Sequence, residues 1–117
     1  MYNVWHDVTL FESSDLATWT SAVVRRQDPQ EEIFNTSVTK TDDGFVMAYE
    51  RKDPLHLHSN IRFARSTDLH VWTRVPDAWF GEDRYAACPT LRYFNGWFYM
   101  LYLEIGKDSP LSFYTYI

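Results

Sequence analysis

The sequence contains one cysteine, Cys88, among its 117 residues. A single thiol excludes a disulfide within the chain and a zinc site built from several cysteines. Four glycines and five prolines are too few for a low-complexity or collagen-like chain. No apolar run approaches the roughly 18 residues of a membrane-spanning helix, so we expect no membrane partner.

Positive charge is also scarce, because 16 acidic residues against 11 lysines and arginines leave a net charge of −5. An acidic chain without a basic cluster is a poor partner for nucleic acid, so we expect no such partner. Residues 1–7 lack the basic segment and apolar stretch of a secretory signal. We therefore expect a cytoplasmic location for a chain with this N-terminus.

Aromatic residues are abundant, at 18% of the chain, with 5 Trp, 8 Tyr and 8 Phe. So many rings require a large core or a surface that stacks on flat ligands. The apolar share of 45% also excludes a disordered chain. The composition therefore predicts a folded domain in which aromatic packing is prominent.

Two motifs occur twice in the sequence. Residues 13–20 and 66–73 both read S-x-D-L-x-x-W-T, and Asp15 and Asp68 are 53 residues apart. Residues 43–50 and 95–104 share a turn followed by an aromatic-rich segment, and Tyr102 follows Tyr49 by 53 residues. A repeat of about 50 residues with strand-like patterning is typical of propeller blades.

The residue pattern predicts an all-β fold, a fragment of a β-propeller with four-stranded antiparallel blades. We expect residues 33–76 to form one complete blade, residues 1–24 the end of another, and residues 86–117 an incomplete third. The strands expected in the three parts lie at residues 8–12, 19–24, 34–40, 45–49, 60–65 and 71–75, and within 86–117.

A propeller needs at least four blades to close, and 117 residues hold only about 2.2 repeats of this length. We therefore expect the sequence to be an internal part of a longer protein, or to close by association between chains. Uncovered blade faces and strand edges predict that the chain self-associates.

The motifs resemble those of the five-bladed β-propeller glycoside hydrolases, which include arabinanases, β-xylosidases, invertases and fructan hydrolases. In that superfamily S-x-D-L-x-x-W links the third and outer strands of a blade. Ala87, Cys88 and Pro89 resemble its E-C-P segment, residues 96–102 resemble its aromatic hairpin strand, and Asn35 stands where a D-P-S segment is often found. The resemblance implies a parent glycosidase that acts on an oligo- or polysaccharide without a cofactor, and an isolated segment that is inactive.

The sequence departs from the superfamily at both acidic positions. Ala87 replaces the glutamate of E-C-P that serves as general acid, and Asn35 replaces the aspartate of D-P. Neither side chain exchanges protons near neutral pH. Two hypotheses therefore stay open: other carboxylates perform glycoside hydrolysis, or the propeller binds carbohydrate or another partner without catalysis.

Two carboxylates at the ends of predicted strands are candidate catalytic groups. In an antiparallel blade the inner strand begins where the second strand ends, so Glu50 and Glu104 should share one rim with Asn35 and Ala87. Glycoside hydrolysis uses two carboxyl groups that flank the scissile bond. We predict Glu104 as the acid and Glu50 as a supporting carboxylate; the alternative is that each is a solvated or ion-paired rim residue.

Polar and aromatic residues near this rim are candidate sugar contacts. These predicted substrate-binding residues are Asn35, His56, His58, Trp5 and Tyr85. The H-x-H pair could supply half of a zinc site, but no matching Cys or His recurs, so we expect no metal.

Three further residues receive structural interpretations. Cys88 has no adjacent base, which favours a buried free thiol over a nucleophile. Trp19 and Trp72 belong to the repeated motif and are predicted to pack between blades.

Overall fold

The structure is a computed structural model that describes residues 7–26, 30–52, 58–105 and 113–116. Within these ranges the chain forms nine strands in three antiparallel sheets and no helix, which confirms the prediction of an all-β fold. Consequently, no described segment is a helix that could cross a membrane.

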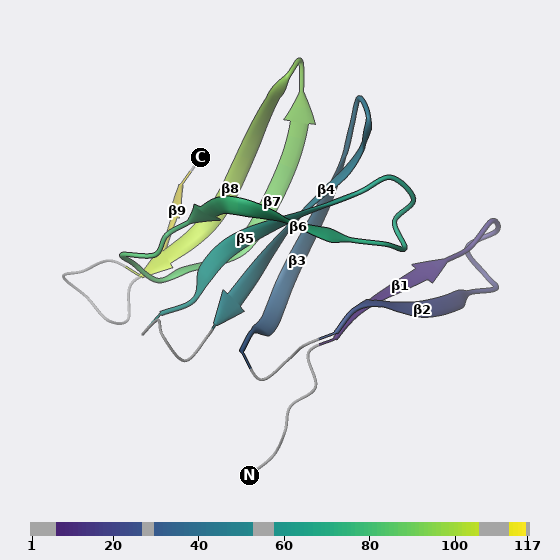
Figure 1. Cartoon of the computed structure of the whole chain (residues 1–117), viewed down its shortest axis with the longest axis horizontal. Helices are drawn as coiled ribbons and strands as arrows, with labels where there is room; N and C mark the ends of the chain where they lie inside the picture. The colour runs from purple at the N-terminus through teal and green to yellow at the C-terminus, as the bar shows by residue number, and fades with distance from the viewer. Residues whose placement is uncertain (1–6, 27–29, 53–57, 106–112, 117) are drawn as a thin grey trace, which may run out of the picture.

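Each sheet is built from strands that follow one another in the chain (Figure 1). The first contains β1 (Val8–Glu12) and β2 (Thr20–Arg25), and the middle one contains β3 (Glu32–Thr41), β4 (Gly44–Lys52), β5 (Asn60–Ser66) and β6 (Thr73–Phe80). The third contains β7 (Ala86–Phe94), β8 (Trp97–Ile105) and β9 (Phe113–Tyr116). The sheets are named below by their first and last strands.

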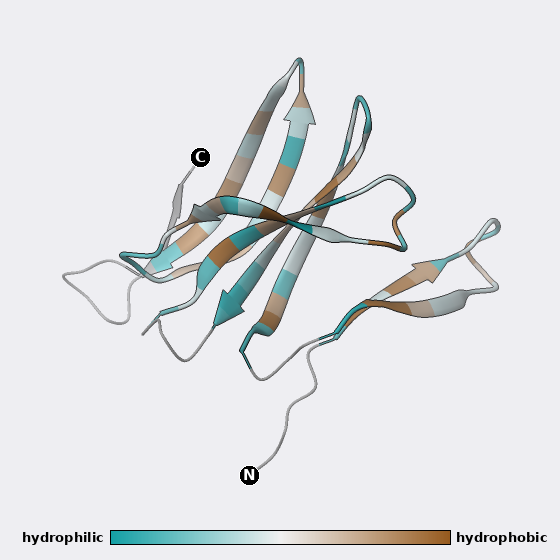
Figure 2. Ribbon diagram, viewed as in Figure 1, coloured by the Kyte–Doolittle hydropathy of each residue, from teal (hydrophilic) through white to brown (hydrophobic). Residues whose placement is uncertain are grey.

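The middle β3–β6 sheet is buried on both faces because apolar residues occupy successive positions of its strands. Val46 and Ala48 of β4 belong to a cluster shared with the β7–β9 sheet, whereas Met47 and Tyr49 belong to a cluster on the opposite face. Side chains alternate between the two faces of a strand, so this run of buried residues requires a neighbour on each side. Figure 2 shows the apolar bands along these strands.

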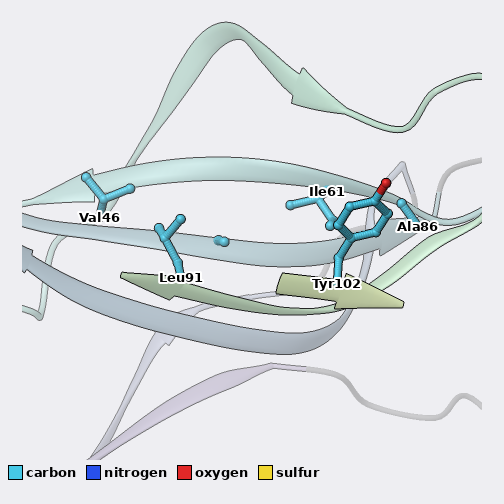
Figure 3. Packing of buried hydrophobic residues seen from close by; sticks show 6 residues of the cluster. Val46, Ile61, Ala86, Leu91 and Tyr102 are labelled. Carbon is cyan, nitrogen blue, oxygen red and sulfur yellow. The ribbon is translucent and has the colours of Figure 1, made fainter. Parts of the chain in front are cut away.

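The contact between the β3–β6 and β7–β9 sheets contains the larger apolar cluster (Figure 3). Its buried members are Val46, Ala48, Ile61, Ala86, Leu91 and Tyr102. Strand β7 also lies beside β3, where backbone N–H groups of β7 donate to hydroxyl groups of β3. Leu91 N lies 3.0 Å from Ser37 Oγ, and Tyr93 N lies 3.0 Å from Thr39 Oγ1.

The β1–β2 sheet contacts the other face through apolar and polar groups. Val8 packs against the cluster that contains Met47 and Tyr49. Arg25 Nη2 donates to Glu31 Oε2 at 2.7 Å and to Tyr49 Oη at 3.1 Å. Burial, the largest cause, raises the pKa of Tyr49 to about 12, so its phenol is neutral at physiological pH.

The first S-x-D-L-x-x-W segment forms a turn that its own side chains hold. Asp15 Oδ1 accepts backbone N–H groups of Ala17 and Thr18 at 2.9 and 2.8 Å, and Trp19 Nε1 donates to the carbonyl of Leu16 at 3.2 Å. Leu16 has φ 64°, a left-handed conformation that a leucine adopts only when its surroundings fix it.

The second copy of the motif reproduces this turn. Leu69 has φ 69°, Asp68 Oδ1 accepts two backbone N–H groups, and Trp72 Nε1 donates to the carbonyl of Leu69 at 2.7 Å. The same unusual conformation at the same motif position shows that the 53-residue sequence repeat is also a structural repeat.

The two motif tryptophans differ in their surroundings. Trp72 is partly buried and packs against the cluster of Ile33, Met47 and Tyr49. Trp19 is 50% exposed, so its predicted burial is wrong, because among the described residues none covers the outer side of the β1–β2 sheet at Trp19.

Strand β6 runs to Phe80 and therefore past the predicted end at residue 75. It contains Pro76, which a strand at the edge of a sheet tolerates because no neighbour requires its missing N–H. The register with β5 shifts between Arg62 and Ala64, consistent with a bulge at this place. Trp79 lies within β6, with the guanidinium of Arg62 4.5 Å from its ring centre.

The packing of Leu91 predicts a large effect of its truncation. Leu91 is 1% exposed and lies between two sheets that touch mainly through side chains. We expect Leu91→Ala to lower the free energy of unfolding by about 2–5 kcal/mol. Val71→Ala, at a residue that is 69% exposed in a turn, should stay within about 0.5 kcal/mol of the wild type. Similar urea midpoints for the two variants would contradict this packing.

The turn aspartates predict an acid-sensitive component of stability. Hydrogen bonds from the backbone of Thr18 and Ala17, in this order, lower the pKa of Asp15 from 3.8 to about 2. The ionised carboxylate is thus favoured in the folded chain, so its contribution is present above about pH 4 and is lost as the pH falls toward 2.

We expect the stability difference between the wild type and Asp15→Asn, measured by urea unfolding, to shrink over this pH range. Asp68→Asn provides the matched variant, because backbone hydrogen bonds also lower the pKa of Asp68. A difference that stays constant between pH 5 and pH 2 would contradict the assigned cause.

Candidate functional site

The strand register brings the predicted site positions to one edge of the sheets. Glu32 at the start of β3 pairs with Lys52 at the end of β4, and Ala86 at the start of β7 pairs with Glu104 near the end of β8. We call this edge the rim. The expected relation between the starts and the ends of these strands is therefore present.

The two strands that begin at the rim are both irregular near their starts. The β3–β4 register shifts between Ile33 and Thr36, and the β7–β8 register shifts between Ala87 and Thr90. Within the second irregularity Cys88 has φ 49°. Bulges of this kind redirect side chains and are frequent beside functional sites.

A carboxylate connects the two irregular segments. Asn35 Nδ2 donates to Glu50 Oε2 at 2.8 Å, and the backbone N–H of Cys88 donates to the same oxygen at 3.2 Å. Asn35 Nδ2 also lies 3.3 Å from Cys88 Sγ. Glu50 is only 4% exposed, whereas Asn35 and Cys88 are exposed. We call these three residues the Asn35–Glu50–Cys88 cluster.

The charge of Glu50 affects the acidity of its neighbours. Partial burial, and then the Glu50 carboxylate, raise the pKa of the Cys88 thiol. Burial, followed by Glu50 and Cys88, also raises the pKa of Tyr85. The phenol and the thiol are therefore neutral donors beside a buried negative charge at neutral pH.

The prediction that Cys88 is buried is wrong. The residue lies at the exposed surface, because the irregular segment between Ala86 and Leu91, which both belong to the apolar contact, turns Cys88 away from it. Cys88 was also missed as part of a polar site. Its position 53 residues after Asn35 is the sequence signal that pairs the two residues.

Glu104 lies at the rim but has different partners. It follows Tyr102 by two positions in β8, and Tyr102 lies in the apolar cluster shared with the β3–β6 sheet. Tyr102 Oη donates to Glu104 Oε2 at 3.1 Å, and Arg84 Nη1 lies 3.7 Å from Glu104 Oε1. Because side chains alternate along a strand, Glu104 points toward the space between the two sheets.

The structural repeat explains this ion pair. Arg84 and Glu104 stand 53 residues after Glu31 and Arg51, whose side chains approach to 3.5 Å. The same contact therefore occurs in two sheets with its charges exchanged. Counted by the 53-residue repeat, Glu50 corresponds to the residue before Glu104. Since side chains alternate along a strand, the two glutamates project from opposite faces of their strands.

Only some of the other predicted substrate-binding residues lie near this cluster. Asn35 contacts Glu50 directly, whereas Tyr85 is linked to the same cluster through the charges of Glu50 and Cys88, which contribute, after burial, to its raised pKa. His58 is exposed and belongs neither to this cluster nor to the Glu104 pair. Trp5 and His56 lie outside the described residues. Within the described ranges no three His, Cys, Asp or Glu residues gather in a way that could hold a metal ion.

Comparison of the chain with protein-family models, curated proteins and solved structures gives no match. The function of the rim must therefore be inferred from its own residues. The geometry offers a buried carboxylate acceptor, an exposed amide, a neutral phenol and a neutral thiol on one surface.

The cluster predicts an altered thiol reactivity. Because burial and Glu50 raise the pKa of Cys88, its reaction with iodoacetamide should reach half-maximal rate at a higher pH than that of a free thiol. Glu50→Gln removes the negative charge and should move this midpoint to lower pH. Glu104→Gln, whose carboxylate is not a cause of the shift, is the matched control. Equal midpoints in the wild type and Glu50→Gln would contradict the arrangement.

Proposed function

We propose that the three sheets are consecutive blades of a β-propeller and that the rim binds a neutral carbohydrate. The observation that carries this proposal is the contact between Asn35 and Cys88, which are 53 residues apart and touch at 3.3 Å. Equivalent residues of successive repeats come together where the repeats converge. In a propeller this place is the central axis, around which the innermost strands begin.

The contacts between sheets support the same arrangement. Among the described strands, β7 has its most extensive contact with β3, less with β4 and less again with β5. No contact of β7 with β6 is as extensive as these. Sheets that are close at their first strands and separate toward their last are the arrangement expected of blades around an axis. The repeat and the order of contacts together support blade-like packing.

The chemistry of the rim suits sugar hydroxyl groups. Asn35 is exposed and can both donate and accept hydrogen bonds, and Glu50 provides an acceptor behind it. Tyr85 adds an aromatic ring and a neutral hydroxyl. The field of Glu50 disfavours an anionic ligand, which selects neutral sugars over uronic acids and sugar phosphates.

A thiol nucleophile is less consistent with this site. The causes that raise the pKa of Cys88 favour its protonated form, whereas a catalytic thiol needs a lowered pKa or an adjacent base. The conclusion for this segment is therefore recognition of a sugar rather than covalent catalysis by Cys88.

Hydrolysis of a glycosidic bond by the parent protein is the second candidate. The observation that favours it is the location of two glutamates, Glu50 and Glu104, at the same rim. In this hypothesis Glu104 is the acid and Glu50 the supporting carboxylate. Glu104 would have to leave Tyr102 and Arg84 to reach a substrate, which makes binding without catalysis the better-supported reading.

Binding can be tested by calorimetric titration of the 117-residue chain with neutral xylo-, arabino- and fructo-oligosaccharides. Asn35→Ala and Glu50→Gln should weaken binding about 10- to 100-fold, the effect expected when a hydrogen bond to a charged group is lost. Glu104→Gln should leave the affinity unchanged. Tighter binding of an oligouronate than of the neutral sugars, or equal affinities in all variants, would contradict the proposal.

Release of a chromophore from aryl glycosides separates the two candidates. If hydrolysis is detected in the chain or in a longer protein that contains it, Glu104→Gln should lower the rate about 10²- to 10⁴-fold with folding unchanged. Full activity in that variant would remove Glu104 from the mechanism. Binding without hydrolysis in every variant is the result expected from the favoured function.

A further inference from the structure

The face of the β3–β6 sheet that meets the β1–β2 sheet carries polar residues at the rim. Arg51 pairs directly with Asn60, and Tyr49 pairs directly with Arg62, so these four residues of β4 and β5 share one face. Glu50 lies between Tyr49 and Arg51 in β4 and therefore points to the opposite face, toward the β7–β9 sheet. The rim thus has a second group of polar side chains, separated from the Asn35–Glu50–Cys88 cluster by the sheet itself.

Asn60 and Arg62 are buried with few partners. Asn60 is 0% exposed, and among the described residues neither Oδ1 nor Nδ2 of its side chain has a hydrogen-bond partner. Arg62 is 4% exposed, and its Nε and Nη1 also have none within the described chain. Burying a polar group without a partner is costly, because the group loses its hydrogen bonds to water. Two such residues, two positions apart on one face of β5, therefore indicate a binding site.

The charges around Arg62 favour an anion at this site. Arg62 Nη2 lies 3.4 Å from Glu82 Oε1, which is long for a hydrogen bond between charged groups. Burial, and then the positive charges of Arg51 and Arg74, lower the pKa of Arg62. A guanidinium stays protonated in proteins, so a buried positive charge with two like charges near it remains at neutral pH. An added negative charge would stabilise it.

The orientation of Arg62 leaves its N–H groups accessible to such an ion. Its guanidinium lies over the ring of Trp79, 4.5 Å from the ring centre. Stacking of this kind occupies a flat face of the group, whereas the N–H groups lie in its plane. Oxoanions match this planar set of donors. Because Arg62 and Asn60 are almost entirely buried, we expect the ligand to be a small oxoanion rather than a phosphorylated macromolecule.

We propose that Arg62 and Asn60 bind inorganic phosphate. Asn60 distinguishes phosphate from sulfate, because its amide provides an acceptor as well as donors. At neutral pH phosphate keeps a hydroxyl group that donates to Asn60 Oδ1, whereas sulfate is fully deprotonated and can only accept. Asn60 Nδ2 and the N–H groups of Arg62 donate to the remaining oxygens. The proposal is independent of carbohydrate binding, because these residues lie on the face of the β3–β6 sheet opposite to Glu50.

Calorimetric titration of the 117-residue chain with inorganic phosphate and, separately, with sulfate at equal ionic strength tests the proposal. The wild type should bind one phosphate per chain, and sulfate at least about 10-fold more weakly, because sulfate leaves the buried acceptor of Asn60 without a partner. Arg62→Met should weaken phosphate binding about 10- to 100-fold, since hydrogen bonds to a charged group are lost. Asn60→Leu should abolish the preference for phosphate. Arg65→Met, at an exposed residue on the other face of β5, is the matched control and should bind phosphate like the wild type.

Every other outcome contradicts the proposal. Absence of saturable phosphate binding to the wild type excludes the site. Equal affinities for phosphate and sulfate, or equal losses in Arg62→Met and Arg65→Met, indicate a general effect of charge. If far-ultraviolet circular dichroism shows that Arg62→Met is unfolded, Arg62→Lys replaces it. This variant keeps the charge but loses the planar set of N–H groups, so phosphate binding should still weaken about 10-fold. The comparison of the two anions in the wild type requires no variant.

Discussion

The rest of the structure depends on the burial of both faces of β4. Val46 and Ala48 contact one neighbouring sheet while Met47 and Tyr49 lie in the cluster beneath the other, so apolar residues at successive positions impose three layers. A strand with this pattern cannot be stable in an isolated hairpin with one wet face. The middle sheet therefore orders its neighbours, and it also places the ends of β4 and β8 at one rim.

At the rim this apolar packing is replaced by polar contacts. One of these contacts occurs in both repeats, and another occurs in only one. The ion pair of Glu31 with Arg51 returns as Arg84 with Glu104, with the charges exchanged, so its place in the fold requires opposite charges but not a particular order. Glu50 has no such counterpart. It instead accepts hydrogen bonds from the two irregular segments, one from a side chain and one from the backbone. The contacts of Glu50, which do not recur in the next repeat, are thus the feature that distinguishes the two repeats at the rim.

The sequence was most informative where local interactions determine the structure. The two S-x-D-L-x-x-W turns follow from side-chain hydrogen bonds within seven residues, and the hairpin of β3 and β4 follows from its turn residues. The extension of β6 past Pro76 could not be foreseen, because a proline is tolerated only once the strand is known to be an edge. The exposure of Cys88 was missed because it depends on an irregular register, and a shift of one residue reverses the direction of every side chain.

An offset of one residue also separates the two carboxylates that look equivalent in the sequence, because Glu104 follows Glu50 by one residue more than the length of the repeat. Glu50 and Glu104 both end strands at the rim, yet the pairing of Ile33 with Arg51 and of Ala86 with Glu104 places them on opposite faces. Glu50 therefore accepts hydrogen bonds from the two irregular segments, whereas Glu104 has Tyr102 and Arg84 as its partners. Since a repeat fixes the backbone but leaves each side chain free to change, the distinctive polar chemistry of this rim resides in equivalent positions whose residues differ, such as Asn35 and Cys88, rather than in those that the repeat preserves.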